Sequence, residues 1–297
     1  MTAGIVVGVD ESEGAAAALR WAAREGQLRG EPVTAVMAWG YTEQHHVPRG
    51  PFDPGYGDED AGAALDATVA VALGPRAAAA VERRALRGPA APTLLGEADG
   101  ADLLVVGARG LGGFDELLLG SVGQQCVQHA PCPVAVVRGR IAGDRGTGEH
   151  VVVGVDGSPP SRAALAWAVE EARLRSARLT VVRAHLPAYV LELPDAGGLA
   201  WEQSVADEAT RATLEAAVEA VDATGVAVDR MVVADRPAPA ILTAAADADL
   251  IVVGSRGYGA FKGMLLGSVS HHLTHHATCP VVVLRSPAEG QPEQARR

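Results

Sequence analysis

The sequence predicts an α/β protein built from two tandem copies of a five-stranded, mostly parallel, Rossmann-like sheet domain. Its length of 297 residues is about twice that of a typical domain of roughly 150 residues. Valine-rich apolar runs alternate with alanine-rich amphipathic stretches, which is typical of buried parallel strands joined by helices. Such alternation requires right-handed crossovers, with helices on both faces of the sheet.

The third observation is an internal repeat. A shift of 146 residues superimposes V-V-G-V-D at 6–10 on the same letters at 152–156, and a shift of 147 superimposes L-L-G-S-V at 118–122 on 265–269. The register therefore changes by one residue over a whole half, which indicates a tandem duplication. We expect a first domain over 1–140, a linker over 141–149, a second domain over 150–290 and a disordered tail over 291–297.

Each expected element has a counterpart in the other half. The strands are expected at 5–9, 32–38, 81–86, 102–106 and 134–138, and again at 151–155, 178–184, 228–234, 249–253 and 281–285. The helices are expected at about 13–29, 60–73 and 119–129, and again at about 159–176, 200–223 and 266–276. Ser158 followed by Pro159 is typical of an N-cap with proline at the first helical position.

The segment between Gly88 and Gly100 departs from this pattern. It contains Pro89, Pro92 and Gly96, where the second half has the better helix former A-I-L-T-A-A-A at 240–246. Because glycine costs up to about 1 kcal/mol at a helical position, we expect this helix to be short or frayed in the first half only.

Composition excludes several classes of function. The net charge of −11 and an aromatic content of 4% disfavour binding to nucleic acid, which needs a basic surface and stacking side chains. No apolar run reaches the roughly 18 residues that cross a bilayer, so no membrane association is expected. No signal peptide precedes the first strand, and Cys126, Cys132 and Cys279 cannot all pair, which together predict a cytoplasmic protein with small buried cysteines.

The candidate site lies in the loops that follow the strands, because ligands of open parallel sheets bind beyond the carboxyl ends of the strands. After the fourth strand both halves read G-x-x-G, nine residues, then G-S. Glycines allow close backbone approach and positive φ, and the next helix offers free N–H groups at its start. Arg109 and Arg256 can neutralise phosphate, while Asp10 and Asp156 suit a ribose hydroxyl or a base amino group. The pattern therefore predicts a nucleotide-binding site in each half.

Two other interpretations stay open. Glycine-rich turns also serve simple chain reversal, although their repetition in both halves favours a shared geometric demand. Gly113 pairs with Ala260, so that position is not expected to need positive φ. Asp10 and Asp156 can instead stabilise the start of a helix, at about 0.3–1 kcal/mol. Walker A, dinucleotide and nucleophile-elbow motifs are all missing.

A histidine cluster occupies the last expected helix of the second half. His271 with His275 and His272 with His276 have the i, i+4 spacing that zinc sites use. The first half has glutamines at three of these four places, which favours a solvated or interface helix over a metal site.

The glycine motif, with V-G-V-D in the first strand and C-P-V before the last, resembles that of the universal stress protein family, in the tandem two-domain form common in actinobacteria. The resemblance covers roughly 4–138 and 150–286. It implies the adenine nucleotide alpha hydrolase-like fold, with ATP, accompanied by Mg²⁺, bound in both halves. By position, the resemblance implies that Gly8, Asp10 and Ala38 contact the adenosine. It implies that the ribose and phosphates are bound by Gly107, Ala108, Arg109, Gly110, Leu111, Gly112, Gly113, Gly120, Ser121 and Val122. The second set is Gly154, Asp156, Ala184, Gly254, Ser255, Arg256, Gly257, Tyr258, Gly259, Ala260, Gly267, Ser268 and Val269.

Three functions follow as hypotheses. The leading one is an ATP-binding regulator of a stress or dormancy response that acts on an unidentified protein partner. The second is a slow ATPase or nucleotide-transfer enzyme, although no obvious general base lies in the motif. The third is a ligand-free dimerisation module that pairs through the apolar last strands. In each case we expect the two halves to pack about an approximate two-fold axis and the chain to form a homodimer through its remaining apolar edges.

Overall fold

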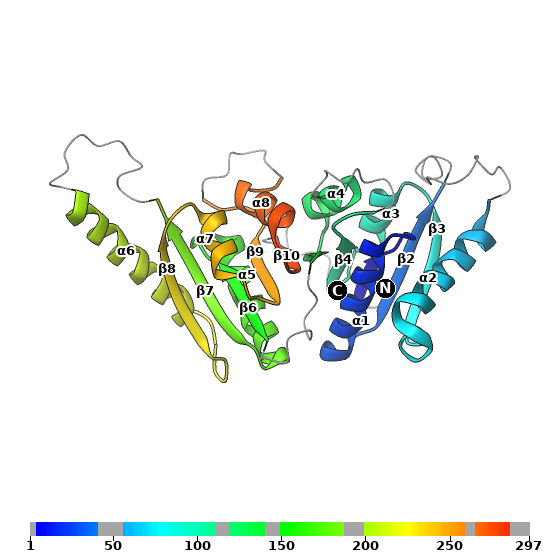
Figure 1. Ribbon diagram of the computed structural model, residues 1–297, viewed down its shortest axis with the longest axis horizontal. Coiled ribbons are helices and arrows are strands. Elements are labelled where there is room, and N and C mark those ends of the chain that lie inside the picture. Colours follow the sequence, from blue (N-terminus) through cyan, green and yellow to red (C-terminus); the bar gives the residue numbers. More distant parts are fainter. Residues whose placement is uncertain are drawn as a thin grey trace, which may run out of the picture.

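The computed structural model describes residues 4–40, 56–110, 119–139, 149–186, 199–258 and 265–285. Ten strands form a single sheet in the order β3-β2-β1-β4-β5-β10-β9-β6-β7-β8. Figure 1 shows the two halves side by side, with α2 at one end of the molecule and α6 at the other. The predicted α/β class and tandem arrangement are confirmed.

The first half has five strands, β1 (Ile5–Gly8), β2 (Val33–Trp39), β3 (Val81–Arg87), β4 (Leu103–Gly107) and β5 (Val134–Val137). Its helices are α1 (Glu13–Arg29), α2 (Asp58–Ala78), α3 (Ala90–Glu97) and α4 (Ser121–His129). β1 pairs in parallel with both β2 and β4, so the order of the strands reverses between β1 and β4. This switch point is where an open sheet leaves a crevice for a ligand.

The second half repeats this arrangement. Its strands are β6 (His150–Gly154), β7 (Arg178–His185), β8 (Val228–Ala234), β9 (Leu250–Gly254) and β10 (Val281–Leu284). Its helices are α5 (Pro159–Arg175), α6 (Leu199–Glu219), α7 (Pro237–Ala244) and α8 (Ser268–His276). The order reverses between β6 and β9, which places a second switch point in the molecule.

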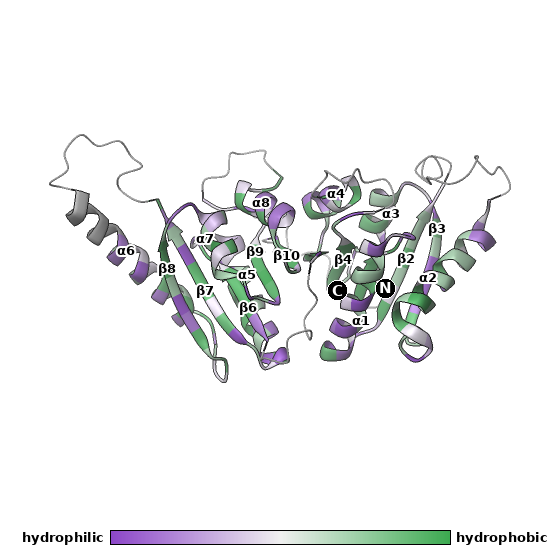
Figure 2. Cartoon of the chain, in the orientation of Figure 1, coloured by the Kyte–Doolittle hydropathy of each residue, from purple (hydrophilic) through white to green (hydrophobic). Residues whose placement is uncertain are grey.

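The helices cover both faces of the sheet. One apolar core lies beneath α1, α2, α5 and α6, and the other lies beneath α3, α4, α7 and α8. The central strands are mostly hydrophobic, and the helices contain both hydrophilic and hydrophobic residues (Figure 2). This two-faced burial is why the strands read as continuous valine runs rather than as alternating ones.

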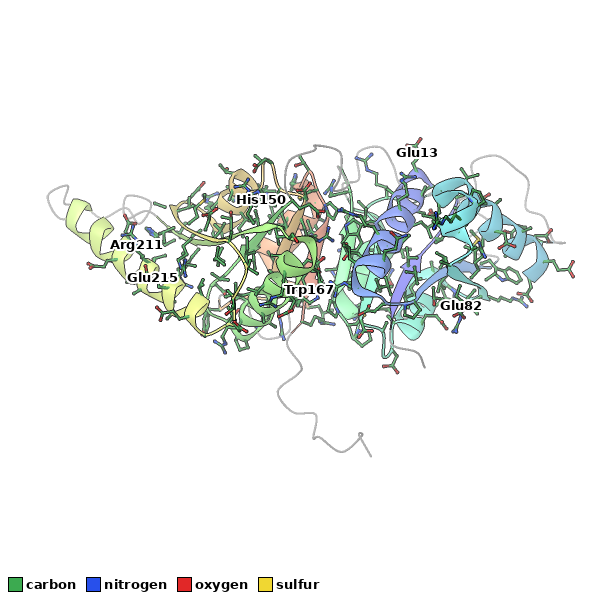
Figure 3. The ribbon with its side chains drawn as sticks, turned by 90° about the horizontal axis from the view of Figure 1, so that it is seen from below. Glu13, Glu82, His150, Trp167, Arg211 and Glu215 are labelled. Atoms are coloured by element: carbon green, nitrogen blue, oxygen red, sulfur yellow. The ribbon has the colours of Figure 1, made fainter. Side chains whose placement is uncertain are left out.

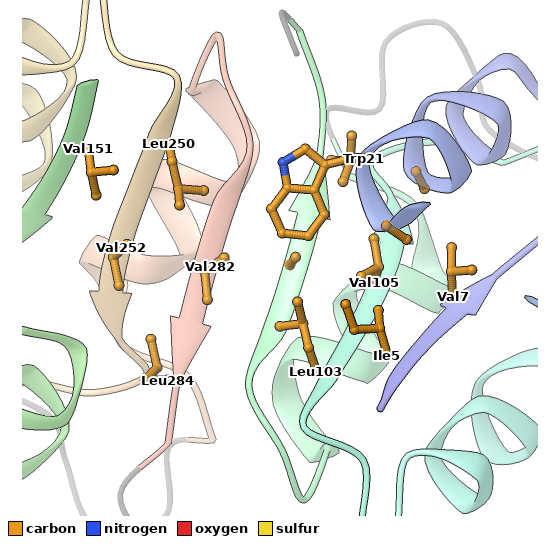
Figure 4. Packing of buried hydrophobic residues seen from close by; sticks show 14 of the residues in the cluster. Ile5, Val7, Trp21, Leu103, Val105, Val151, Leu250, Val252, Val282 and Leu284 are labelled. Atoms are coloured by element: carbon orange, nitrogen blue, oxygen red, sulfur yellow. The ribbon is translucent and has the colours of Figure 1, made fainter. Parts of the chain in front are cut away.

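The halves join through β5 and β10, which pair antiparallel (Figure 4). Ala135 lies opposite Val282, and these two residues are also equivalent under the repeat of 147. A residue that faces its own counterpart marks an approximate two-fold axis, so the predicted packing of the halves is confirmed. The apolar last strands of the two halves thus pair with each other within one chain.

The outer edges of the described sheet are β3 and β8. On β3, Glu82, Arg83, Arg84 and Arg87 are charged and exposed, whereas β8 is mostly apolar and exposes Met231 beside Asp229 and Arg230. Charged edges resist pairing with another sheet. β3 is therefore a poor edge for the expected homodimer, whereas β8 is an apolar outer strand, and homodimerisation stays a prediction.

A group of six charged residues, here called the seam cluster, joins α1 to α5 across the two-fold axis; it consists of Arg24, Glu25, Arg29, Glu149, Glu171 and Arg175. Glu25, Glu171 and Arg175 are buried, and the other three are partly buried. Arg175 binds Glu171 at 2.6 Å and also Glu25 of the first half. Arg29 reciprocates by binding Glu171, and its guanidinium lies 5.0 Å from the centre of the Trp167 ring. Figure 3 shows Trp167 near the middle of the molecule. Burial, together with the nearby Glu171 carboxylate, raises the pKa of Glu25 to about 7.

A second polar group lies at the start of β6, where His150 and Thr180 are buried and Arg178 and Asp247 are partly exposed. The His150 ring is bonded through Nε2 to the Thr180 hydroxyl at 2.9 Å, while its Nδ1 lies 2.9 Å from the Arg178 guanidinium. Arg178 also binds Asp247 at 2.6 Å. Burial, with the positive charge of Arg178, lowers the pKa of His150.

One expected element differs from the structure. α3 is no shorter than its counterpart α7, since each has 8 residues, so the predicted asymmetry is wrong. The reason is position: Pro89 is the N-cap and Pro92 falls in the first turn, where the missing N–H costs nothing. Gly96 lies in the last turn, and Gly100 lies beyond the helix.

Candidate functional site

Three segments of the first half meet at the carboxyl edge of the sheet: the turn after β1, the loop after β4 and the start of α4. The Asp10 carboxylate accepts a hydrogen bond from the backbone N–H of Ser12 at 3.0 Å, and a Cβ on Gly110 would collide with its other oxygen. The Gly120 N–H donates to the Ala108 carbonyl at 2.8 Å. The Ser12 hydroxyl caps α1 by accepting the N–H of Ala15. The structure thus brings the predicted residues together.

The second half has the same arrangement with an extra contact. The Asp156 carboxylate accepts the N–H of Ser158 at 2.9 Å and, through its other oxygen, the N–H of Tyr258 at 3.0 Å. The Tyr258 hydroxyl donates to the Gly157 carbonyl at 3.1 Å. Burial opposes ionisation of Asp156, but the hydrogen bonds outweigh it and lower the pKa of this carboxyl. Asp156 is therefore ionised, and its hydrogen bonds link the turn after β6 to the loop after β9.

The helices α4 and α8 begin without a side-chain cap. Gly120 and Gly267 are their N-cap residues, and neither has a side chain that can accept a hydrogen bond from the first turn. Ser121 and Ser268, the first helical residues, are exposed, and Val122 and Val269 behind them are partly exposed. The uncapped N–H groups and the positive end of the helix dipole are suited to an anion.

The expectation that these glycines adopt positive φ is wrong for every one that the structure describes. Gly120 and Gly267 have φ of −71° and −76°, and the first two glycines of each motif are not among the positive-φ residues either. Close packing explains the glycines at Gly107 and Gly254 instead. A Cβ on Gly107 would lie 2.7 Å from the Gly14 carbonyl group, and a Cβ on Gly254 would lie 2.7 Å from Pro160. The protein's own backbone requires these glycines.

Gly120 is different. A Cβ there would lie 3.7 Å from the nearest atom, which is an ordinary contact distance. No neighbouring group among the described residues therefore excludes a side chain at Gly120. Its counterpart Gly267 is more crowded, since a Cβ there would lie 3.3 Å from both the Arg256 Cα and the Ser255 carbonyl oxygen.

The remaining predicted residues lie farther from this convergence or outside the described ranges. Gly8 and Gly154 lie beneath Leu94 of α3 and Ile241 of α7, so helix packing accounts for them. Ala38 and Ala184 lie near the carboxyl ends of β2 and β7, and the side chains of Arg109 and Arg256 are exposed, whereas Ala108 and Ser255 are buried. Five predicted site residues lie outside the described residues: Leu111, Gly112, Gly113, Gly259 and Ala260.

Sequence reasoning missed two arginines at this edge, Arg138 and Arg285, which directly follow β5 and β10. The repeat of 147 superimposes them, and that signal identifies them. It also missed Ser270, whose hydroxyl donates to the Gly254 carbonyl at 2.6 Å. The first half has Gly123 there, so the repeat gave no signal for this residue.

The histidine cluster forms two stacks on α8. The ring centroids of His271 and His275 are 4.2 Å apart, and those of His272 and His276 are 4.3 Å apart. Within the described ranges, no three or more His, Cys, Asp or Glu side chains gather as a possible metal site.

Comparison with known proteins agrees with this architecture. The profile of the universal stress protein family matches residues 1–138 and 148–285. The chain belongs to the universal stress protein family. A curated universal stress protein of Mycolicibacterium smegmatis is 36% identical over 297 residues, which cover 95% of this chain and 97% of that protein. One of Mycobacterium tuberculosis is also 36% identical, over 295 residues that cover 95% of this chain and 96% of the relative.

A solved structure supports the fold as well. The crystal structure of a universal stress protein from Archaeoglobus fulgidus superimposes with a TM-score of 0.69 at 21% identity and covers 97% of each chain. Both halves of this chain are thus universal stress protein domains. Among the described helices of this universal stress protein, none combines the length and the apolar character needed to cross a membrane.

Proposed function

We propose that each half binds one molecule of ATP, with Mg²⁺, at its switch point, and that the protein is a nucleotide-dependent regulator of a stress or dormancy response. In this proposal, occupancy of the two sites determines which protein partner is bound. Membership of the universal stress protein family and the paired switch points support the proposal.

The observation that carries the proposal is the N-cap glycine of α4. Serine or aspartate at this position normally caps the first turn, which stabilises a helix by about 1 kcal/mol relative to alanine. Gly120 has room for a Cβ and an ordinary φ, so nothing in its described surroundings prevents a capping side chain. Glycine leaves the first-turn N–H groups of α4 free for an anionic ligand.

Charge at this edge also suits phosphates. The protein has a net charge of −11, so it must neutralise a polyanion locally. Arg109 and Arg256 supply exposed guanidinium groups from the loops that face α4 and α8. Guanidinium is a strong hydrogen-bond donor to phosphate oxygens.

The proposal divides the roles among the predicted residues. Gly120, Ser121 and the Arg109 guanidinium would hold the phosphates of one nucleotide, and Gly267, Ser268 and Arg256 those of the other. Asp10 and Asp156 would orient the β1 and β6 turns, since their oxygens already accept backbone N–H groups. Bound Mg²⁺ would neutralise part of the phosphate charge.

The test replaces Gly120 with serine. Gly120→Ser supplies a capping hydroxyl that competes with phosphate for the same N–H groups, so the ligand-free protein should be as stable as wild type or slightly more so. ATP at about 1,000 times its Kd adds about 4 kcal/mol to a folded domain, which raises its melting temperature by on the order of 10 °C. Gly120→Ser should reduce this ATP-induced rise, and Gly120→Ser/Gly267→Ser should abolish it.

Gly62→Ser is the matched control, because a Cβ on Gly62 of α2 meets no atom within 4 Å and this helix is remote from α4. It should keep the full ATP-induced rise. Each rise is measured from the variant's own ligand-free midpoint, so a change in intrinsic stability does not enter. If the double variant retains the wild-type rise, the nucleotide does not bind at these helix starts and the proposal fails.

A further inference from the structure

Arg138 lies beside the first glycine motif because of strand register. Val137, the last residue of β5, is aligned with Gly107, the last residue of β4. The Ala108 N–H donates to the Val137 carbonyl at 2.9 Å, which keeps the two chains together one residue farther on. Arg138 therefore leaves the sheet at the same edge as Arg109.

The second half reproduces this placement with Arg285. Leu284 ends β10 alongside Gly254, and the Ser255 N–H donates to the Leu284 carbonyl at 2.6 Å. Arg285 therefore lies next to Arg256. Two pairs of arginines, Arg109 with Arg138 and Arg256 with Arg285, thus stand at equivalent places in the two halves.

Each pair concentrates positive charge. Among the described residues, no carboxylate lies within ion-pair distance of any of these four arginines. Burial, together with the facing Arg109, lowers the pKa of Arg138, and burial with the facing Arg256 does the same to Arg285. Arg138 and Arg285 are partly buried, while Arg109 and Arg256 are exposed. Like charges that lie near each other are destabilising, and an anion placed between them would relieve the repulsion.

The guanidinium groups of Arg138 and Arg285 are held in place across the seam. Arg138 donates through Nη1 to the Thr274 carbonyl of α8 at 2.7 Å, and Arg285 donates through Nη1 to the Ala130 carbonyl at 3.4 Å. Each arginine thus belongs to a strand of one half and is anchored on the other half. A neutral carbonyl leaves the charge of the guanidinium uncompensated, and it fixes one nitrogen while others remain as donors.

We propose that Arg138 and Arg285 are second phosphate-binding cations of the two sites, which makes the sites selective for nucleoside di- and triphosphates over monophosphates. This inference rests on the proposed function, because it assigns residues to the same sites. Arg109 and Arg256 remain the first cations, and the added pair meets the extra negative charge of a longer phosphate chain. A nucleoside monophosphate has too short a chain to engage both cations.

The test is the ratio of the affinities for ATP and AMP, measured by calorimetry on the full chain. Arg138→Gln/Arg285→Gln removes both charges. Loss of a charge-assisted hydrogen bond at each site should weaken ATP binding about tenfold or more. AMP binding should change less than about twofold, since AMP would use only the first cation and the helix start.

Two further variants separate charge from structure. Arg20→Gln/Arg211→Gln removes the same net charge from exposed positions on α1 and α6, and Figure 3 shows Arg211 on the outer helix. This control should leave both affinities unchanged. Arg138→Lys/Arg285→Lys keeps the charge but loses the guanidinium geometry, so it should recover part of the selectivity for ATP.

The possible outcomes are distinct. A fall in the ATP-to-AMP ratio confined to the Arg138→Gln/Arg285→Gln variant supports the proposal. An unchanged ratio overturns it, whether both nucleotides weaken together, as a purely structural role at the seam predicts, or neither does. If the wild-type protein binds neither ATP nor AMP, the proposed function itself fails, and the inference fails with it.

Discussion

Replacing Glu25 with glutamine should make the protein more stable at alkaline pH and have little effect in mild acid. The pKa of Glu25 rises from 4.5 to about 7 on folding, because burial disfavours the carboxylate and Glu171 lies close by. A carboxyl with a raised pKa binds its proton more tightly in the folded state than in the unfolded state. The stability it contributes is therefore complete below pH 4.5 and is lost as the pH rises through about 7.

The size of the effect follows from the same values. A pKa difference of one unit corresponds to about 1.4 kcal/mol, so between about pH 5 and about pH 8 the wild type should lose roughly 2–3 kcal/mol through this group. Glutamine has nearly the shape of the protonated acid and does not titrate. The unfolding free energy of Glu25→Gln minus that of the wild type should therefore rise by roughly 2–3 kcal/mol over the same interval.

Urea denaturation at about pH 5 and about pH 8 measures this difference, and subtraction cancels the other titrating groups. Arg20→Gln is the control, since it removes an exposed charge from α1 without touching the seam cluster. A difference between Glu25→Gln and wild type that is the same at both pH values would refute the reasoning. A difference that falls as pH rises would show that Arg175 and Arg29 outweigh burial.

Three other predictions concern packing and charge. Gly110→Ala should destabilise the protein by roughly 1–3 kcal/mol in urea denaturation, because its Cβ would collide with the Asp10 carboxylate; an unchanged midpoint would contradict the contact. Gly154→Ala should cost about 1 kcal/mol, since its Cβ would meet the flexible end of Ile241, and Ile241→Val in the same chain should recover most of that loss; a simple sum of the two single losses would contradict it. The lowered pKa of His150 means that its contribution to stability is present above pH 6.5 and is lost as the pH falls below it. The melting temperature of His150→Gln should therefore fall less than that of wild type on acidification to about pH 5.5, and an equal fall would contradict the assignment.

The repeat made most of the fold predictable from the sequence. Because the strands are buried on both faces, their valine runs stand out from the surrounding segments, and the second copy confirms each boundary within a few residues. The approximate two-fold packing of the halves was also expected, but pairing of the apolar last strands was expected only between chains, in the dimerisation hypothesis, whereas β5 and β10 pair within one chain. The exact start of α4 was not predicted: the helix begins at Ser121, two residues later than expected, because Gly120 is its N-cap.

The candidate site was predicted in part. The motif placed Asp10, Gly110 and Gly120 together, since all three lie at the carboxyl edge of adjacent strands. The sequence did not distinguish a glycine that the backbone requires, such as Gly107, from one that it does not, such as Gly120. That distinction depends on distances between elements far apart in the chain.

Long-range contacts also explain what was missed. Arg138 looks like an ordinary strand end in the sequence, and its importance follows from register with β4 and from its bond to α8 of the other half. The seam cluster cannot be predicted from local sequence either, because Glu25 and Arg175 are 150 residues apart in the chain. Three-dimensional structure was needed for both.

The most direct test of two nucleotide sites per chain is the number of ATP molecules bound at saturation, measured by equilibrium dialysis with labelled ATP and Mg²⁺. The account predicts two per wild-type chain, one for Gly120→Ser and one for Gly267→Ser. Absence of ATP binding to the wild type, or two molecules still bound by Gly120→Ser/Gly267→Ser, would contradict it.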